Sequence, residues 1–102
     1  METLELFSIE KTESETRFYL RGTLDFQSAP ALNPAVNQII ESRALRVVVD
    51  LSQLDIIDSS GIAVIVKLYK GIKTYNGVLT VAGAKDQPLS ILKLLRLDKV
   101  FL

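Results

Sequence analysis

The stretch that decides the fold is residues 56–66, Ile56-Ile57-Asp58-Ser59-Ser60-Gly61-Ile62-Ala63-Val64-Ile65-Val66. Two isoleucines of strand character lead into a polar turn, and from Ile62 the apolar residues recur at the spacing of a helix. The apolar face continues to Ile72, and Asn76-Gly77 ends the helical pattern. This stretch therefore predicts a strand, a tight turn over residues 58–61 and a long apolar helix.

Further strands are expected on both sides of this stretch. Residues 45–51 form a nearly continuous, β-branched apolar run, which is typical of a central strand covered on both faces. Residues 78–83 have strand character as well. Because strand, helix and strand alternate from residue 45 onward, we expect parallel pairing with right-handed crossovers.

The N-terminal part predicts a hairpin. Residues 4–9 form a weak strand, residues 10–15 are polar and indicate a turn, and residues 16–24 alternate between apolar and polar side chains. Two strands joined by so short a turn are expected to pair with each other.

Two more helices complete the pattern. The first runs to about Ser42 and begins either at Asn33, as an N-cap before Pro34, or earlier, at Ser28. The second is opened by Gln87-Pro88, and residues 98–102 are expected to start one more strand.

Composition excludes several classes of function. The 102 residues suit one domain, and twelve basic and twelve acidic side chains cancel, so no excess charge attracts nucleic acid or an anionic membrane. The absence of cysteine and histidine removes thiolate metal sites and the commonest general base. No apolar stretch reaches the roughly 18 residues of a membrane span, and the acidic N-terminus is unlike a signal peptide. We expect a cytoplasmic protein whose partner is another protein or a small ligand.

The polar turn is the candidate site. A serine is expected at the helix N-cap, with its hydroxyl facing the unpaired amides, but Ser59 and Ser60 supply two hydroxyls where capping needs one. A helix N-terminus also tolerates a phosphate, which would add roughly −1.5 to −2 charges beside Asp58 and repel a docked partner. Ser60 is expected to point about 100° from Ser59 and to bond the first helical turn. Gly61 is expected to let a partner's backbone approach closely.

The apolar run after the turn is open to two interpretations. Either the helix is packed on a sheet and flanked by another element, or Ile62 and Val64 belong to a partly exposed patch that a partner covers.

Enzymatic activity is not expected. No histidine can activate Ser59, Lys67 and Lys70 lie two or more helical turns away, and no glycine-rich loop with a lysine could hold a nucleotide. The sequence predicts no cofactor and no metal site.

Residues 58–70 resemble the signature segment of STAS domains, specifically the bacterial anti-sigma factor antagonists. Gly22-Thr23-Leu24-Asp25 is similar to the family's Gly-x-Leu-Asp element, residues 47–52 to its central strand and residues 54–57 to its approach to the turn. The resemblance covers nearly all of residues 1–102 and implies a single STAS domain. The implied fold is α/β, a mixed sheet of four to five strands with helices mainly on one face, in the order β-β-α-β-α-β-α-(β). Since family members usually continue into a C-terminal helix, the resemblance implies that this helix is missing or truncated here.

The resemblance also implies a function. In this family the first serine of the turn, here Ser59, is phosphorylated by an anti-sigma factor that is itself a GHKL-type serine kinase. The unphosphorylated antagonist binds that kinase and releases the sigma factor, and a PP2C-type phosphatase reverses the modification. Asp25 is expected to lie near the turn and contact the partner, and Asp58 to position the serine or recognise the kinase. The alternative is a scaffold that is not phosphorylated, in a stressosome-like or transporter-associated complex. A monomer that pairs with its partner fits the neutral charge.

Overall fold

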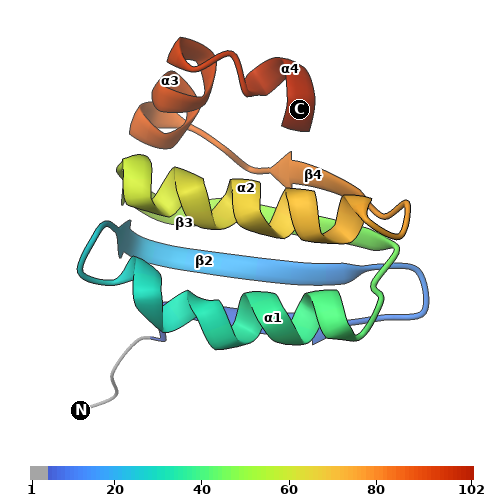
Figure 1. The fold of residues 1–102 in the computed structure, drawn as a ribbon. Helices are drawn as coiled ribbons and strands as arrows, with labels where there is room; N and C mark the ends of the chain where they lie inside the picture. Colours follow the sequence, from blue (N-terminus) through green and yellow to red (C-terminus); the bar gives the residue numbers. More distant parts are fainter. Residues whose placement is uncertain (1–4) are drawn as a thin grey trace.

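Four strands form one mixed sheet in the order β1-β2-β3-β4, as the computed structural model of residues 5–102 shows (Figure 1). Strand β1 (Phe7–Lys11) pairs antiparallel with β2 (Thr16–Leu24), which confirms the expected hairpin. Strand β3 (Arg46–Ile57) runs parallel to β2 on one side and to β4 (Val78–Ala82) on the other. The predicted parallel pairing after residue 45 is therefore confirmed.

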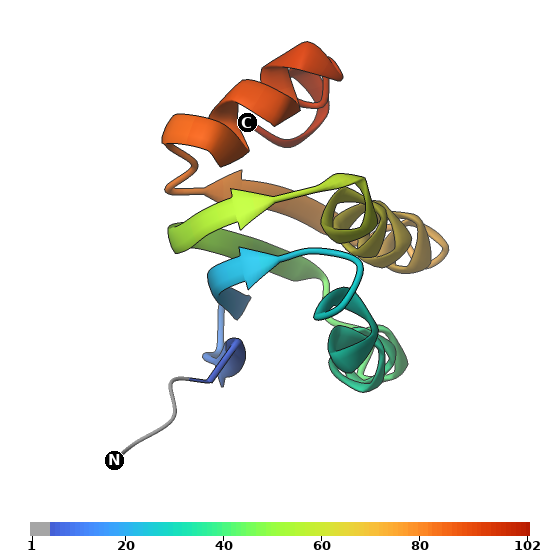
Figure 2. The same cartoon turned by 90° about the vertical axis from the view of Figure 1, so that its left-hand side faces the viewer.

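Two helices cover one face of the sheet. The 3-10 turn η1 (Ala29–Leu32) leads into α1 (Asn33–Glu41), which lies beside α2 (Ser59–Lys73) on the same face (Figure 2). Helices α3 (Asp86–Leu94) and α4 (Asp98–Phe101) lie beyond the β4 edge, and the opposite face carries no helix from residues 5–102. The expected α/β fold with helices mainly on one face is confirmed. None of the helices in residues 5–102 is both long and apolar enough to cross a membrane.

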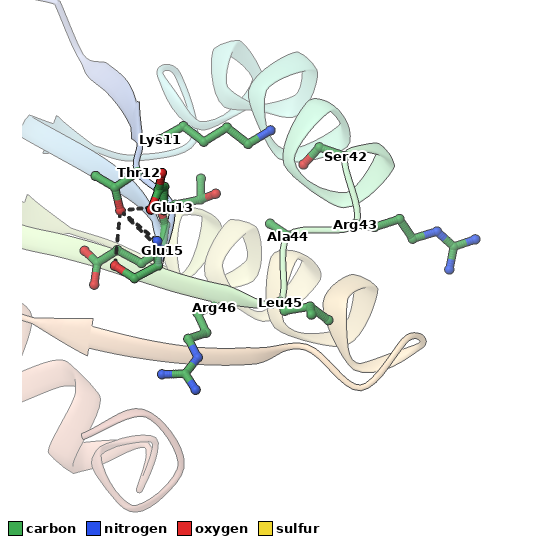
Figure 3. A pocket seen from close by; sticks show the side chains of 11 residues that line it. Lys11, Thr12, Glu13, Glu15, Ser42, Arg43, Ala44, Leu45 and Arg46 are labelled. Atoms are coloured by element: carbon green, nitrogen blue, oxygen red, sulfur yellow. Dashed lines mark hydrogen bonds between the residues drawn. The ribbon is translucent and has the colours of Figure 1, made fainter.

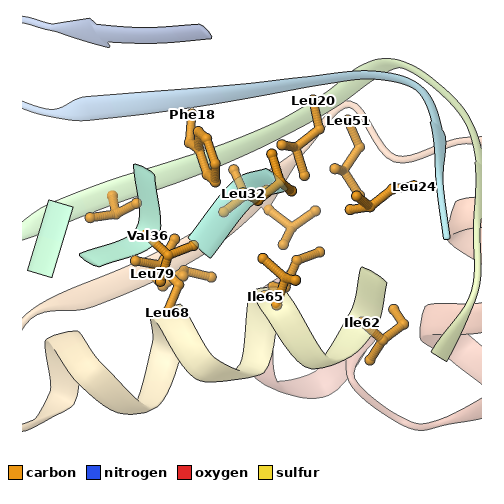
Figure 4. Packing of buried hydrophobic residues seen from close by; sticks show 14 of the residues in the cluster. Phe18, Leu20, Leu24, Leu32, Val36, Leu51, Ile62, Ile65, Leu68 and Leu79 are labelled. Carbon is orange, nitrogen blue, oxygen red and sulfur yellow. The ribbon is translucent and has the colours of Figure 1, made fainter. Parts of the chain in front are cut away.

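The core lies between the sheet and helices α1 and α2 (Figure 4). It is built from alternate residues of the strands and from the apolar faces of the helices: Phe18, Leu20, Leu24, Leu32, Val36, Val49, Leu51, Ile65, Leu68 and Leu79. Ile62 and Val64 are only 6% and 7% exposed. For Ile62, Val64 and Ile65 the interpretation as an exposed apolar patch is therefore wrong, because the sheet covers α2 on one side and α1 covers it on another. Within the same run Ala63 is exposed and Val66 is half-buried.

The boundaries near the N-terminus differ from the prediction. Strand β1 begins at Phe7 and not at residue 4, which lies outside the described residues, and it extends to Lys11. Asn33 is the first residue of α1 and makes no side-chain cap; Leu32 occupies the N-cap position. The alternative of an earlier start is nearer the structure, because Ser28 is the N-cap residue of η1, although its side chain caps nothing there.

Two predictions farther along the chain were also wrong. Strand β3 continues past residue 51 to Ile57, because β2 pairs with it up to the pair Leu24↔Ile57 and because Leu54 and Ile57 are buried. Residues 98–102 contain helix α4 and no fifth strand, so the sheet has four strands within residues 5–102. Phe101 of α4 is buried and meets Tyr69 edge to face, with ring centroids 5.4 Å apart.

Candidate functional site

Asp58, and not a serine, caps helix α2. Its backbone is extended (φ −108°, ψ −173°), and its Oδ1 accepts hydrogen bonds from the amides of Ser60 at 2.8 Å and Gly61 at 3.1 Å. The prediction of a serine N-cap is therefore corrected by one residue. Aspartate serves this position because its carboxylate meets the unpaired amides of the first turn and also the positive end of the helix dipole.

Ser59 is the first residue of α2, and its side chain is exposed. The amides of Ser60 and Gly61 donate their hydrogen bonds to Asp58. Among residues 5–102, no hydrogen bond at this turn uses the hydroxyl of Ser59 or Ser60. Ser60 is half-buried, and its amide, not its hydroxyl, takes part in the first turn. The expectation that the Ser60 hydroxyl bonds the first turn was therefore wrong, since Asp58 already occupies that role.

Gly61 is buried against the chain itself. A Cβ built on Gly61 would lie 2.5 Å from Cγ1 of Ile57 and 2.8 Å from the carbonyl oxygen of Leu24. The missing side chain therefore lets α2 begin close to the ends of β2 and β3. The expected role, close approach by a partner's backbone, is corrected: the backbone that approaches belongs to Leu24 of the same chain.

The second carboxylate oxygen of Asp58 ties the turn to the loop after β2. Oδ2 of Asp58 accepts a hydrogen bond from the Phe26 amide at 3.1 Å, and the Asp58 amide donates to the carbonyl of Leu24 at 3.1 Å. Residues that are 32 positions apart in the sequence are thus held side by side. The expectation that Asp25 lies near the turn is confirmed, because its neighbour Phe26 is bonded to Asp58.

The Asp25 carboxylate shapes its own loop. Its Oδ1 accepts from the amides of Gln27 at 3.0 Å and Ser28 at 3.1 Å, and the Ser28 hydroxyl lies 3.2 Å away. The same hydroxyl is 2.9 Å from the carbonyl oxygen of Thr23 and accepts from the Asp25 amide at 3.0 Å. These bonds hold residues 25–28 in a compact turn beside the start of α2.

A shallow hollow of about 270 Å³ opens between this loop and α2. Its lining is mostly apolar and includes Phe26, Ala29, Pro30, Asn33, Ser60, Ala63 and Val64. Phe26 is 69% exposed, whereas Phe7, Phe18 and Phe101 are buried or half-buried. No local sequence pattern marks Phe26, because only the bond between its amide and Asp58 places it beside the serines.

Gln87 is a second residue that the sequence marked only as a helix start. Its side-chain amide donates to the Ile57 carbonyl at 2.8 Å and accepts from the Ile57 amide at 2.9 Å. Because Ile57 directly precedes Asp58, Gln87 fastens α3 to the residue before the turn. A single glutamine ahead of a proline carries no sequence signal for this contact.

The face of the sheet without helices carries a partly buried ion pair between Arg17 and Asp50. Asp50 is 7% exposed, and its Oδ2 lies 3.0 Å from Nε of Arg17, whose guanidinium also pairs with Glu15 at 2.9 Å. Burial alone would raise the pKa of Asp50, but bonds from the Ser52 hydroxyl and amide and from Arg17 together hold its pKa below the usual value. The carboxylates of Glu15 and Asp50 together raise the pKa of Arg17. This cluster joins β2 to β3 and lies away from the turn.

A larger hollow of about 590 Å³ lies at the opposite end of the sheet, between the β1–β2 turn and the start of β3 (Figure 3). The charges of its lining are mixed, with Lys11, Arg43 and Arg46 as the basic residues and Glu13 and Glu15 as the acidic ones, and the Arg43 side chain extends away from both glutamates (Figure 3). The hydroxyl of Thr12 closes the turn by accepting from the Glu15 amide at 3.1 Å. None of the predicted site residues lines this hollow, so the turn over residues 58–61 remains the candidate site.

Comparison with known proteins agrees with this architecture. A protein of Thermotoga maritima has the same fold with a TM-score of 0.85 and 20% identity, over 93% of this chain and 82% of that one. An anti-sigma factor antagonist of Mycobacterium paratuberculosis matches with a TM-score of 0.83 and 23% identity, over 93% and 80% of the two chains. Phosphorylated SpoIIAA of Bacillus, described as a cell fate determinant, matches with a TM-score of 0.75 and 16% identity, over 94% and 88%. These similarities support the fold.

The family follows from the sequence match that accompanies this fold. A family model for the STAS domain matches residues 7–102, which include the strand before the turn, the turn itself and helix α2. The chain belongs to the STAS domain family.

Proposed function

We propose that this protein is an anti-sigma factor antagonist controlled by phosphorylation of Ser59. In its unphosphorylated form it binds a GHKL-type serine kinase that acts as an anti-sigma factor. Phosphorylation by that kinase abolishes binding, and a PP2C-type phosphatase restores it. The protein is thus the substrate of a reaction that another protein catalyses, and it is not itself an enzyme.

One observation carries the proposal: Ser59 is exposed at the first position of α2, on a turn that the rest of the chain holds in place. Asp58 and Gly61 build this turn through a cap and a close packing contact, and neither needs the Ser59 hydroxyl. A kinase can therefore reach the hydroxyl, and its modification leaves every described hydrogen bond of the turn intact.

The cap also decides where a phosphate would lie. Oδ1 of Asp58 already accepts from the amides of Ser60 and Gly61, so these donors are occupied. A phosphate on Ser59 would stay near the positive end of α2 but project toward solvent. It would add roughly −1.5 to −2 charges beside the Asp58 carboxylate. This concentration of negative charge supports loss of a partner without unfolding of the domain.

The proposed partner surface consists of the residues predicted from the sequence, and they differ in how far the structure exposes them. Asp25, Asp58, Ser59 and Ser60 are half-buried or exposed around the turn. Val64 is buried but lines the hollow beside Phe26. Gly61 and Ile62 are buried and support this surface from below. With such a partner the protein acts as a monomer in the cytoplasm, where sigma factors and ATP are found.

Phosphate transfer is the direct test. The serine kinases of the GHKL type encoded in the same genome are purified and incubated one at a time with this protein and ATP, and the modified residue is located by mass spectrometry. We expect one phosphate, on Ser59, and none on Ser59→Ala. Ser60→Ala removes the neighbouring hydroxyl and should still carry its phosphate on Ser59. Absence of phosphate on the wild type with every kinase would overturn the proposal.

Binding separates this proposal from the scaffold alternative. Ser59→Asp places a negative charge at the modified position and is expected to weaken kinase binding, whereas Ser59→Ala is expected to bind as the unphosphorylated wild type does. A scaffold whose function does not depend on phosphate would retain its function in the cell with both substitutions.

A further inference from the structure

We propose that Phe26 is the anchor residue of the kinase interface, the side chain that contributes most to kinase binding. The hollow beside it receives an apolar side chain of the kinase. This inference rests on the proposed function and adds a recognition element that lies outside the phosphorylated turn.

The position of Phe26 is the first argument. The amide of Phe26 donates a hydrogen bond to Oδ2 of Asp58 at 3.1 Å. Leu24, two residues before Phe26, accepts a hydrogen bond from the Asp58 amide through its carbonyl, also at 3.1 Å. The backbone of the loop is therefore fixed relative to Ser59. A protein whose active site reaches the Ser59 hydroxyl must also lie over the Phe26 loop, because that loop is bonded to the turn itself.

The exposure of Phe26 is the second argument. Several aliphatic residues of the domain are also exposed, but Phe26 is the aromatic member of that set, and it is 69% exposed although its backbone amide is bonded to Asp58. An aromatic ring gains much by leaving water and loses little entropy on binding, so such residues commonly dominate protein interfaces. Neither the core nor the turn uses this side chain.

The hollow gives the chemistry of the occupant. Its lining is apolar except for two polar members, Ser60 and Asn33, and its apolar members are Phe26, Ala29, Pro30, Ala63 and Val64. None of the charged side chains of residues 5–102 lines it. A kinase side chain that fits is therefore aliphatic or aromatic, and a charged one would lose its hydration there without a partner charge.

The experiment compares Phe26→Ala with the wild type as substrates of the kinase that modifies Ser59. We expect the KM for the variant to rise at least about tenfold with kcat retained, because the ring contributes to binding while the Ser59 geometry is unchanged. The Asp58–Phe26 bond survives, since it uses the backbone amide. Phe26→Leu, which keeps an apolar side chain, should recover part of the loss.

A second variant blocks the hollow with a longer side chain and leaves Phe26 in place. Ala63 is exposed on α2, so Ala63→Arg should fold normally and project a long side chain over the hollow. It should raise KM as Phe26→Ala does. Leu45→Ala removes an equally exposed apolar side chain at the opposite end of the sheet, and Ser90→Arg adds the same charge on α3. Both controls should stay within about twofold of wild type.

The outcomes distinguish the two proposals. If the wild type is phosphorylated on Ser59 and both Phe26→Ala and Ala63→Arg keep the wild-type KM, the anchor is wrong and the switch stands. If no kinase modifies the wild type, the proposed function fails and the anchor fails with it. Thermal unfolding of each variant shows whether the domain remains folded, and a variant with a wild-type melting curve and a raised KM supports the anchor.

Discussion

The side-chain amide of Gln87 pairs with both backbone polar groups of Ile57, donating to its carbonyl at 2.8 Å and accepting from its amide at 2.9 Å. Strand β4 pairs only with residues 46–50 of β3, from Arg46↔Val78 to Asp50↔Ala82. Farther along that edge no strand from residues 5–102 is present to bond Ile57. Gln87 takes the place of a strand residue there and connects helix α3 to the residue that precedes Asp58.

Replacing Gln87 by alanine should therefore destabilise the domain and loosen the turn. Two backbone groups lose their partner, and we expect the free energy of unfolding to fall by about 1–2 kcal/mol. Urea denaturation measures this loss, and hydrogen exchange should show faster exchange of the Ile57 amide. Ser90→Ala, on the exposed side of α3, is the control and should be neutral. Unchanged exchange at Ile57 would contradict the assignment.

Removing the carboxylate of Asp58 should cost more than removing either serine hydroxyl. Asp58→Ala breaks the cap to two amides and the bond to Phe26, and we expect a loss of about 1–2 kcal/mol. Asp58→Asn keeps an acceptor and should recover much of it. Ser59→Ala should change stability by less than about 0.5 kcal/mol, because the side chain is exposed. Equal losses for Asp58→Ala and Ser59→Ala would show that the serine shares the cap.

Gly61→Ala tests whether the glycine serves packing within the chain. The new methyl group would meet Ile57 and the Leu24 carbonyl at under 3 Å, so the start of α2 would have to move away from β2 and β3. We expect destabilisation by about 1–3 kcal/mol, measured by thermal or urea unfolding. Ser60→Ala, one residue earlier, is the matched control. A stable Gly61→Ala that has lost only partner binding would restore the original interpretation of an approach by a partner.

The buried Asp50 predicts an acid dependence of stability. Its pKa is lowered in the folded protein, so the unfolded chain binds the proton more readily, and stability rises with pH through that range. The contribution is complete above the unfolded pKa of about 3.9 and is lost as pH falls through the folded pKa. Asp50→Asn should lower the free energy of unfolding by about 1 kcal/mol at pH 7 and by much less near pH 2. Urea denaturation at the two pH values checks this, and equal losses at both would contradict it.

Local pattern was enough for much of the architecture. The alternation over residues 16–24 predicted β2 within its observed bounds, and the helical spacing after Ile62 predicted α2, because both patterns reflect which side of an element faces the core. The turn with its two serines, followed by an apolar helix, was visible in the same way. These features depend on neighbours within a few positions of each other.

The tertiary structure decided what depends on distant residues. Strand β3 runs without interruption from the predicted run 45–51 to Ile57 because β2 pairs with Gln53, Leu54, Ile56 and Ile57, although the sequence pattern predicted the central strand only to residue 51. Asp58 rather than a serine became the N-cap, and its second oxygen reaches the Phe26 amide, 32 positions away. The sequence determined that Ser59 stands where a strand meets a helix. Only the fold placed Leu24, Phe26 and Gln87 around that turn, because hydrogen bonds and packing contacts across a sheet join segments that no local pattern connects.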